Sequence, residues 1–452
     1  MAQVNLLEAY GKKLALSEQV YAKNHNGVTM PGSVKLATAR CIQNANAFLN
    51  ESLSGDSATQ FGDMKTLKAF CTTIATITVP SLIATSLVKT VPMTSQHGVI
   101  AYPVIVAGSN KGGVARGDLV NSPFALGNID KDYSAARVAE TIKLDSNKSA
   151  KLAWSPVLLT SDNKLLAGFD KDGKEIAVKL MKDATEYTYT ATADGIITVS
   201  TPSAAENDEL KVGYIYDNAY IPANDIPTIA LKMEQIPLFA KIRRLAVYFS
   251  QLAAFQSKMD YGIDLKEMLS TQAVAEIQYE IDTEVCTMLA EAAPADPTLS
   301  FSKAVQGTNA ISVAQHYADF ATVIYAARSA VYKRTKKFSP NWMLCAVDVM
   351  EIMNFVPGFH AAPASVMAGP YFAGEVGGLK VFVSAALEDG TFVFGCNSPE
   401  LNASCGVFAP YMPIIPTMLV EGPDGGNTQG FATMYDCKVI NPLLLVKGKV
   451  TA

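Results

Sequence analysis

The longest regular pattern of hydrophobic positions lies between Asp264 and about Ala293. Apolar residues recur there at intervals of three and four, the spacing that places side chains on one face of an α-helix. They are Leu265, Met268, Leu269, Val274, Ile277, Ile281, Val285, Met288 and Leu289. At about 1.5 Å per residue, the predicted helix spans roughly 45 Å. Pro294 and Pro297 mark its end.

The polar positions of this predicted helix are nearly all acidic. Seven carboxylates stand against one base and cannot neutralise one another: Asp264, Glu267, Glu276, Glu280, Asp282, Glu284 and Glu291, against Lys266. Three interpretations remain open. The face can be solvated, it can hold a carboxylate pair for acid–base catalysis, or a basic element of this chain or a neighbouring copy can lie across it.

Other stretches predict both helices and strands. A helical pattern from Ser33 to Ser52 has little of its own to pack on, so we expect it to lie across a neighbouring copy or the body of the protein. Short β-type runs separated by Asp-Gly and Asn-Asp turns fill the region from Lys143 to Asp225. The C-terminal third alternates helices with apolar strands, at Met343 to Val347, Leu379 to Ser384, Thr391 to Phe394 and Gly406 to Tyr411. This mixture predicts an α+β fold.

One uncharged stretch, Ala69 to Val88, is long enough to cross a bilayer on length alone. Seven of its residues are Ser or Thr, however, and Pro80 interrupts its middle. We therefore expect a buried strand and turn, with no membrane association. The N-terminal residues up to Tyr21 carry charge throughout and lack the apolar core of a signal peptide.

Composition narrows the class of protein. Charged residues make up only 17 % of the chain, against roughly 25 % in an average soluble domain. Few charges indicate either a large interior or an extensive interface between subunits. The net charge of -5 argues against a protein that binds nucleic acid through its phosphates. We interpret the basic cluster at Lys333, Arg334, Lys336 and Lys337 as a solvated helix end or loop rather than a DNA contact.

The sequence contains no recognisable enzyme motif. We therefore expect no catalytic residue, cofactor or metal. It has no phosphate-binding glycine loop, no nucleophile elbow and no metalloprotease helix. The seven cysteines show no metal-ligand spacing and are predicted to be buried free thiols; they stand at positions 41, 71, 286, 345, 396, 405 and 437.

Three blocks of sequence resemble the major capsid proteins of T-even-type myoviruses, a family of tailed bacteriophages. The first runs from Leu82 to Tyr102 and contains Val91-Pro92-Met93-Thr94. The second is the basic run Ala240-Lys241-Ile242-Arg243-Arg244-Leu245, followed by the long acidic helix with Glu276-Ile277-Gln278-Tyr279-Glu280. The third joins Gly406 to Pro413 with Gly430-Phe431-Ala432-Thr433-Met434-Tyr435 and Asn441-Pro442. Gln251, Phe255, Ala432 and Met434 stand where that family usually carries charged residues.

The resemblance implies a Hong Kong 97-type capsid fold divided into named parts. These parts are an N-terminal arm (1–70), the start of a peripheral domain and extended loop (71–142), a β-rich insertion (143–225), the return strand of that loop (226–259), a spine helix (260–300), an axial domain (301–405) and closing strands (406–452). The family removes an N-terminal propeptide after a motif ending in Glu. Glu8 and Glu51 end possible motifs, but the chain begins at Met1, and we expect no cleavage.

The function that the resemblance implies is structural. The chain would self-assemble through hexameric and possibly pentameric capsomers into an icosahedral head that encloses double-stranded DNA without sequence-specific binding. Vertex, portal, scaffold and decoration proteins would be its partners, and assembly would take place in the host cytoplasm. We hypothesise that Lys241, Arg243 and Arg244 pair with Glu276, Glu280 and Glu284, within or between subunits, as assembly contacts.

Two alternatives come from other functions. An encapsulin-type shell that encloses protein cargo shares the same fold. The β-rich insertion could instead be a carbohydrate-binding module of an adhesin.

Overall fold

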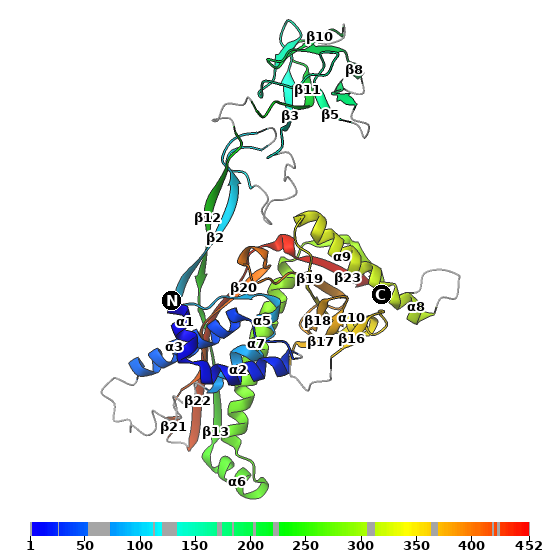
Figure 1. Cartoon of the computed structure of the whole chain (residues 1–452). Coiled ribbons are helices and arrows are strands. Elements are labelled where there is room, and N and C mark those ends of the chain that lie inside the picture. The colour runs from blue at the N-terminus through cyan, green and yellow to red at the C-terminus, as the bar shows by residue number, and fades with distance from the viewer. Residues whose placement is uncertain are drawn as a thin grey trace. The chain divides into compact units, whose positions relative to one another are not determined.

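The computed structural model describes residues 2–25, 27–52, 73–111, 114–119, 133–169, 174–182, 185–201, 205–219, 226–304, 312–362, 369–417, 420–422 and 425–451 (Figure 1). The chain divides into two compact units. Unit 1 comprises Met1–Tyr102 and Gln235–Ala452, and unit 2 comprises Pro103–Glu234. Strands β2 (His97–Ala107) and β12 (Ile229–Phe239) pair with each other and carry the chain from one unit to the other.

Unit 1 combines helices with two sheets. Its helices are α1 (Ala2–Ala9), α2 (Gly11–Asn24), α3 (Gly32–Ser52), α5 (Ala84–Leu87), α6 (Gln251–Tyr261), α7 (Leu265–Ala292), α8 (Val313–Ala318), α9 (Phe320–Thr335) and α10 (Val347–Met353), with 3₁₀ turns η2 (Leu401–Ala403) and η3 (Pro442–Leu444). Its strands are β1 (Lys89–Thr90), β13 (Lys241–Ser250), β14 (Ala295–Ser302), β15 (Trp342–Cys345), β16 (Phe359–Ala361), β17 (Tyr371–Val376), β18 (Leu379–Val383), β19 (Thr391–Gly395), β20 (Gly406–Pro416), β21 (Val420–Glu421), β22 (Gly426–Val439) and β23 (Val446–Thr451).

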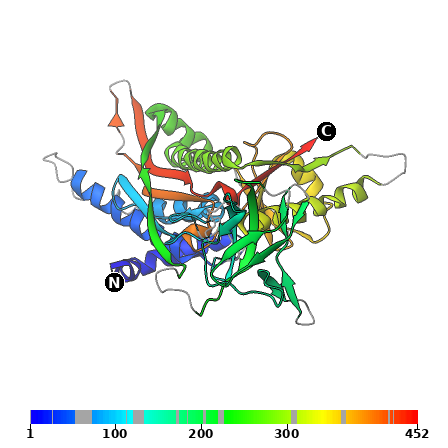
Figure 2. The same cartoon turned by 90° about the horizontal axis from the view of Figure 1, so that it is seen from above.

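The first sheet has the order β1-β20-β22-β13, with β21 added to β22. Because side chains alternate along a strand, its two faces have different partners. Phe431 and Tyr435 of β22 belong to the hydrophobic core that contains Ile277 and Ile281 of α7. The neighbouring Met434 packs on the other side, in the cluster formed with α3 and β20. Figure 2 shows these strands between α7 and the N-terminal helices.

The second sheet has the order β14-β23-β19-β15-β18-β17-β16. All four residues of its central strand β15 are buried, and so are all five of β19. Continuous apolar runs of this kind are what a strand covered on both faces requires. The strands predicted at Met343 to Val347, Leu379 to Ser384, Thr391 to Phe394 and Gly406 to Tyr411 are confirmed as β15, β18, β19 and β20. Two ends differ: Val347 begins α10, and β20 continues to Pro416. The predicted α+β mixture is therefore confirmed.

The predicted helix from Ser33 to Ser52 is confirmed as α3, and it lies across the body of the protein. Ala45 and Leu49 pack on Met412 and Ile415 of β20. The Asn44 amide donates hydrogen bonds to the carbonyl oxygens of Met93, at 3.1 Å, and Tyr411, at 2.7 Å. The α3 helix therefore has a partner within its own chain.

The prediction of a buried strand and turn from Ala69 to Val88 is wrong for the residues that the structure describes. Residues 73–81 are helical, and α5 follows them. Several of these side chains are buried, including Val79, Leu82 and Leu87. Burial against tertiary neighbours has overridden the weak helix propensity of the Thr residues in this stretch. No helix in the described ranges is both long enough and apolar enough to cross a membrane.

The expected return strand from 226 to 259 also needs correction at its end. Strand β13 stops at Ser250, and residues from Gln251 onward form α6. The helix contains no β-branched residue, and it is rich in Ala, Leu, Gln and Met, which favour helices. Gly262, with φ of 66°, ends it in the left-handed conformation that glycine adopts most easily.

Unit 2 is built from strands around a core of its own. Its strands are β3 (Arg137–Lys143), β4 (Ser149–Lys151), β5 (Leu166–Phe169), β6 (Glu175–Ala177), β7 (Leu180–Lys182), β8 (Thr185–Tyr187), β9 (Tyr189–Ala191), β10 (Ile196–Val199) and β11 (Glu209–Ile215). The longest pairing joins β3 to β11 in antiparallel register. The core includes Val138 and Ile142, so it begins before the Lys143 at which the sequence pattern changes.

Candidate assembly contacts along the long helix

The predicted long helix is confirmed as α7, and its ends agree with its sequence. The Asp264 carboxylate accepts hydrogen bonds from the backbone N–H groups of Lys266 and Glu267, which otherwise lack helical partners. The helix ends at Ala292, just before Pro294. Its buried positions recur at helical spacing and include Ile277, Ile281, Val285 and Leu289. This buried face holds the rest of the helix beside β13 and β22.

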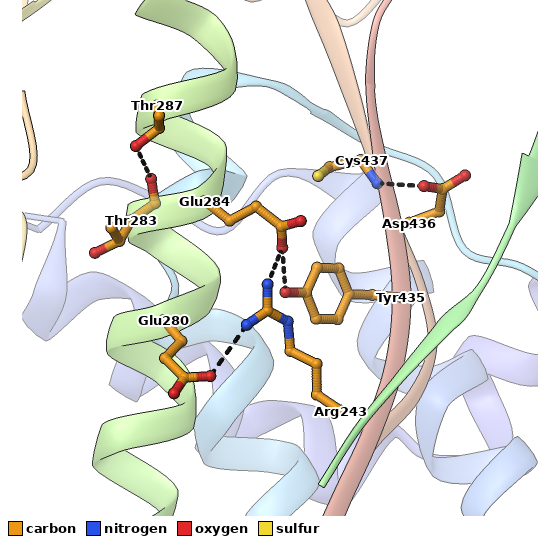
Figure 3. Close-up of polar contacts among 8 residues, drawn as sticks. All are labelled: Arg243, Glu280, Thr283, Glu284, Thr287, Tyr435, Asp436 and Cys437. Atoms are coloured by element: carbon orange, nitrogen blue, oxygen red, sulfur yellow. Dashed lines mark hydrogen bonds and ion pairs between the residues drawn. The ribbon is translucent and has the colours of Figure 1, made fainter.

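Arg243 of β13 lies across the acidic face of α7 (Figure 3). One guanidinium nitrogen, Nη1, is 3.0 Å from Oε2 of Glu280. The other, Nη2, is 2.6 Å from Oε2 of Glu284. Because Glu280 and Glu284 are one helical turn apart, a single forked side chain reaches both. The hypothesis that a basic element covers this face holds for these two carboxylates, and the element belongs to the same chain.

Tyr435 of β22 completes this cluster. Its hydroxyl donates a hydrogen bond to Oε2 of Glu284, and the Arg243 guanidinium lies 5.5 Å from the centre of its ring. Burial, together with the hydrogen bond to the Glu284 carboxylate, raises the pKa of the Tyr435 hydroxyl. Tyr435 therefore stays protonated and acts as a donor. The sequence hypothesis did not include this residue.

The remaining candidates, Lys241, Arg244 and Glu276, are exposed, and the described part of the chain contains no ion pair for any of them. The strand geometry explains the difference between Arg243 and Arg244. Consecutive side chains of a strand point to opposite faces, so Arg244 projects away from α7. Lys241, Arg244 and Glu276 thus remain accessible to a second copy.

Asp282 is a correction to the predicted acidic face, because its side chain is buried and does not contact solvent as the others do. Its two oxygens accept hydrogen bonds from the backbone N–H groups of Ile83, at 3.2 Å, and Ala84, at 2.9 Å. These groups begin α5 and would otherwise be buried without partners. The position of Asp282 among the buried Ile281, Val285 and Cys286 was the signal in the sequence.

Two further predictions can be compared with the structure. Lys333 and Arg334 lie in the last turn of α9, which confirms a helix end. Arg334 donates hydrogen bonds to the carbonyl oxygens of Leu443 and Leu445 and so contacts this chain. Among the described cysteines, those at 41, 286, 345, 396 and 405 are buried free thiols, as predicted, and Cys437 is half-buried. Cys71 lies outside the described residues.

Comparison with known families shows which kind of protein this is. A family model described as major capsid protein Gp23 matches residues 66–452. The chain belongs to the Gp23 family of major capsid proteins. Its role is structural rather than enzymatic, as a subunit that assembles with its copies into the capsid shell of a virion. Family membership and the α+β architecture agree with the expected Hong Kong 97-type fold.

Solved structures resemble the chain at low identity. A protein of Microbacterium phage Oxtober96 is 10 % identical, covering 82 % of this chain and 91 % of its own, with a TM-score of 0.37. The capsid of Myoviridae phage XM1 is 8 % identical, covering 66 % and 90 %, with a TM-score of 0.35. The SrpI encapsulin of Synechococcus elongatus PCC 7942 is 10 % identical, covering 48 % and 77 %, with a TM-score of 0.34. No curated protein gives a significant match.

Proposed function

We propose that this chain forms the icosahedral head of a tailed phage, assembling around double-stranded DNA in the host cytoplasm through hexameric capsomers, and through pentameric ones if it also fills the fivefold vertices. The match to the Gp23 family over residues 66–452 carries this proposal. The net charge of -5 fits a container that surrounds DNA without gripping its phosphates. Vertex, portal, scaffold and decoration proteins would complete the particle.

The parts of the chain take roles in this proposal. Residues 1–70 would be the N-terminal arm. The peripheral domain would begin after this arm, and α7 would be its spine helix. The β-rich segment 143–225, within unit 2, would be the insertion on the extended loop, where it would brace neighbouring subunits. The second sheet of unit 1, with α8 to α10, would form the axial domain around capsomer centres.

The candidate contacts divide into two groups. Arg243, with Glu280 and Glu284, would fasten β13 to α7 within each subunit and so set the shape of the surface. Lys241, Arg244 and Glu276 would contact other subunits, because they are exposed and carry opposite charges. Shell growth favours contacts that are individually modest: at micromolar strength each is worth about 8 kcal/mol, over about 1,600 Å² of buried surface. Wrongly placed subunits can then leave.

Electron microscopy of the full-length recombinant chain tests the proposal. Closed polyhedral particles or flat hexameric sheets are the expected result. A compact monomer at high concentration would contradict it. Particles from infected cells distinguish the phage head from a cargo shell, since the head contains double-stranded DNA and an encapsulin-type shell contains protein.

The proposed intersubunit contacts have their own test. The double variant Lys241→Glu with Arg244→Glu should assemble only at a higher protein concentration than the wild-type chain, and its particles should break apart at lower temperature. Lys333→Glu is the matched control, because it reverses an exposed charge, in the last turn of α9, that belongs to neither proposed contact. Wild-type assembly by the double variant would remove Lys241 and Arg244 from the contacts.

A further inference from the structure

Helix α6 presents its large apolar side chains to solvent and its small ones to the protein. Leu252, Phe255 and Met259 recur at helical spacing and form one face, here named the α6 stripe. Their exposed fractions are 66 %, 63 % and 71 %. The half-buried positions of the helix are Ala254 and Ser257. A surface helix ordinarily has the reverse arrangement, because burying apolar area is what holds it in place.

A further large apolar side chain is exposed near this surface. Tyr248, at the end of β13, is 62 % exposed, whereas the exposed Tyr261 lies on the opposite side of α6 from the stripe. Figure 1 shows α6 at the end of unit 1 where β13 stops and α7 begins. At roughly 100 Å² for each exposed large side chain, Tyr248 and the three residues of the stripe offer on the order of 400 Å². That area matches the largest apolar patch of a typical monomer, a size at which such patches are often functional.

The charges beside the stripe indicate what can cover it. Lys258 lies on one side of the stripe and Asp260 on the other, so the charges that α6 itself carries beside the stripe balance. Such a surface does not attract the phosphates of nucleic acid, which need clustered cations. A partner that carries one apolar face with a positive and a negative flank is complementary to it, and a second copy of this chain has that pattern.

The exposed apolar area of the stripe also indicates a second copy of this chain as the partner. A stable interface buries about 800 Å² on each partner. The α6 stripe and Tyr248 are large enough to supply the apolar centre of one interface, and polar surroundings would supply the rest. In a shell built from copies, every subunit presents the same stripe. Contact between identical stripes buries all of them at once, which contact with a scarcer protein cannot do.

We propose that the α6 stripe is a contact between copies of this chain, in which Leu252, Phe255 and Met259 of one subunit pack against the same three residues of another. This inference rests on the proposed shell function and names one of its interfaces. It adds a second kind of contact to the charged one: an apolar contact centred on α6, insensitive to salt, beside the salt-sensitive contact of Lys241 and Arg244.

Cross-linking of full-length particles tests the contact directly. A Phe255→Cys variant, assembled and then oxidised with glutathione disulfide, should form a disulfide between residue 255 of two subunits, with two glutathiones released. Mass spectrometry of the digested particles would identify the linked peptide. The wild-type chain, treated identically, controls for the native thiols. Particles in which residue 255 stays unlinked, or links to a different protein in virions from infected cells, would overturn the inference.

Substitution of the stripe provides a second, independent measurement. Leu252→Ser, Phe255→Ser and Met259→Ser together should raise the concentration needed for assembly at least tenfold, while Phe255→Leu with Met259→Leu should assemble as the wild-type chain does. All three side chains are exposed, so the subunit itself should remain folded, which circular dichroism would check. Normal assembly by the triple variant would refute the contact and leave the shell function intact. Failure of the wild-type chain to assemble would refute the shell function itself.

Discussion

The Asp282 carboxylate of α7 accepts a hydrogen bond from the backbone N–H of Ala84, at 2.9 Å, although 198 positions separate the two residues. A second bond, from the N–H of Ile83, makes the carboxylate the cap of α5. Helix α5 leads directly into β1, which pairs with β20 of the first sheet. The Asp282 carboxylate therefore also fixes where the chain enters that sheet.

This contact predicts how stability depends on pH. Burial raises the pKa of the Asp282 carboxyl from 3.8 to about 7, and the bonds from Ala84 and Ile83 oppose the rise. The folded state holds the Asp282 proton more tightly than the unfolded state does, so protonation of Asp282 stabilises the fold. This stabilisation is complete below about pH 4 and is lost as the pH rises through about 7. Asp282→Asn has no proton to lose. As the pH rises from 4 to 7, the melting temperature of this variant should therefore rise relative to that of the wild-type chain.

Two outcomes decide this prediction. Parallel pH profiles for Asp282→Asn and the wild-type chain would show that the carboxyl does not titrate in this window. Asp282→Ala leaves both buried N–H groups without an acceptor, whereas the single amide oxygen of Asn can still accept from one of them. The Ala variant should therefore be less stable than the Asn variant at every pH, by about 1–3 kcal/mol.

The two adjacent arginines of β13 should respond differently to the same change. Arg243→Gln removes both ion pairs to α7 and leaves Glu284 with only its bond from Tyr435. Since these groups are about one-third exposed, we expect a loss of about 1–2 kcal/mol in the free energy of unfolding of unit 1. Arg244→Gln should change it by less than about 0.5 kcal/mol. Denaturant titration of unassembled subunits measures both, and equal losses would contradict the assigned contacts.

Unit 2 contains a buried lysine whose role can be tested. The Lys111 ammonium donates hydrogen bonds to the carbonyl oxygens of Tyr133, at 2.9 Å, and Ala135, at 2.5 Å, and its side chain is 2 % exposed. Lys111→Met keeps most of the volume and removes these bonds. We expect hydrogen exchange of the β11 amides to accelerate by at least tenfold, because a loss of about 2 kcal/mol or more is ordinary for such groups. Lys211→Met, exposed on β11, should leave the rates unchanged.

A pair of glycines in strands supplies a test of packing. A Cβ atom on Gly395 of β19 would lie 2.1 Å from the nearest ring atom of Trp342, whose side chain is buried, whereas one on Gly213 of β11 would meet nothing within 4 Å. Gly395→Ala should lower the melting temperature of unit 1, at a cost of about 1–3 kcal/mol or more. Gly213→Ala should be neutral or slightly stabilising. Equal effects would mean that the indole of Trp342 can move aside.

Secondary-structure elements could be predicted correctly where a single sequence pattern, such as the spacing of apolar residues, was sufficient to identify them. Helix α7 was predictable because Ile277, Ile281 and Val285 repeat at helical spacing within a chain segment free of Pro and Gly. The pairing of Arg243 with the acidic face of α7 was one of three interpretations that the sequence left open, because an excess of seven carboxylates over one lysine is equally compatible with a solvated face. Which of the two arginines would pair depended on the register of β13 on β22, and the sequence does not state that register.

Two of the errors have a common physical origin in tertiary contacts. Residues 73–81 are helical despite several Thr residues, because the segment packs on α7, far away in the sequence. Asp282 reads as one more surface acid until the N–H groups of α5 are placed beside it. Helix α6 was missed although Leu252, Phe255 and Met259 recur at helical spacing, because the family resemblance implied a strand that continues to residue 259.

The pairing of Lys89 with Val407 has a consequence for synthesis. The ribosome must add 318 further residues after Lys89 before its strand partner exists, which takes tens of seconds at about 5–20 residues per second. Unit 2, whose residues are all made in that interval, can fold while the first sheet still waits for its central strands. A nascent chain therefore lacks the completed surface of unit 1 until translation is nearly over, and truncated products cannot present it to growing shells.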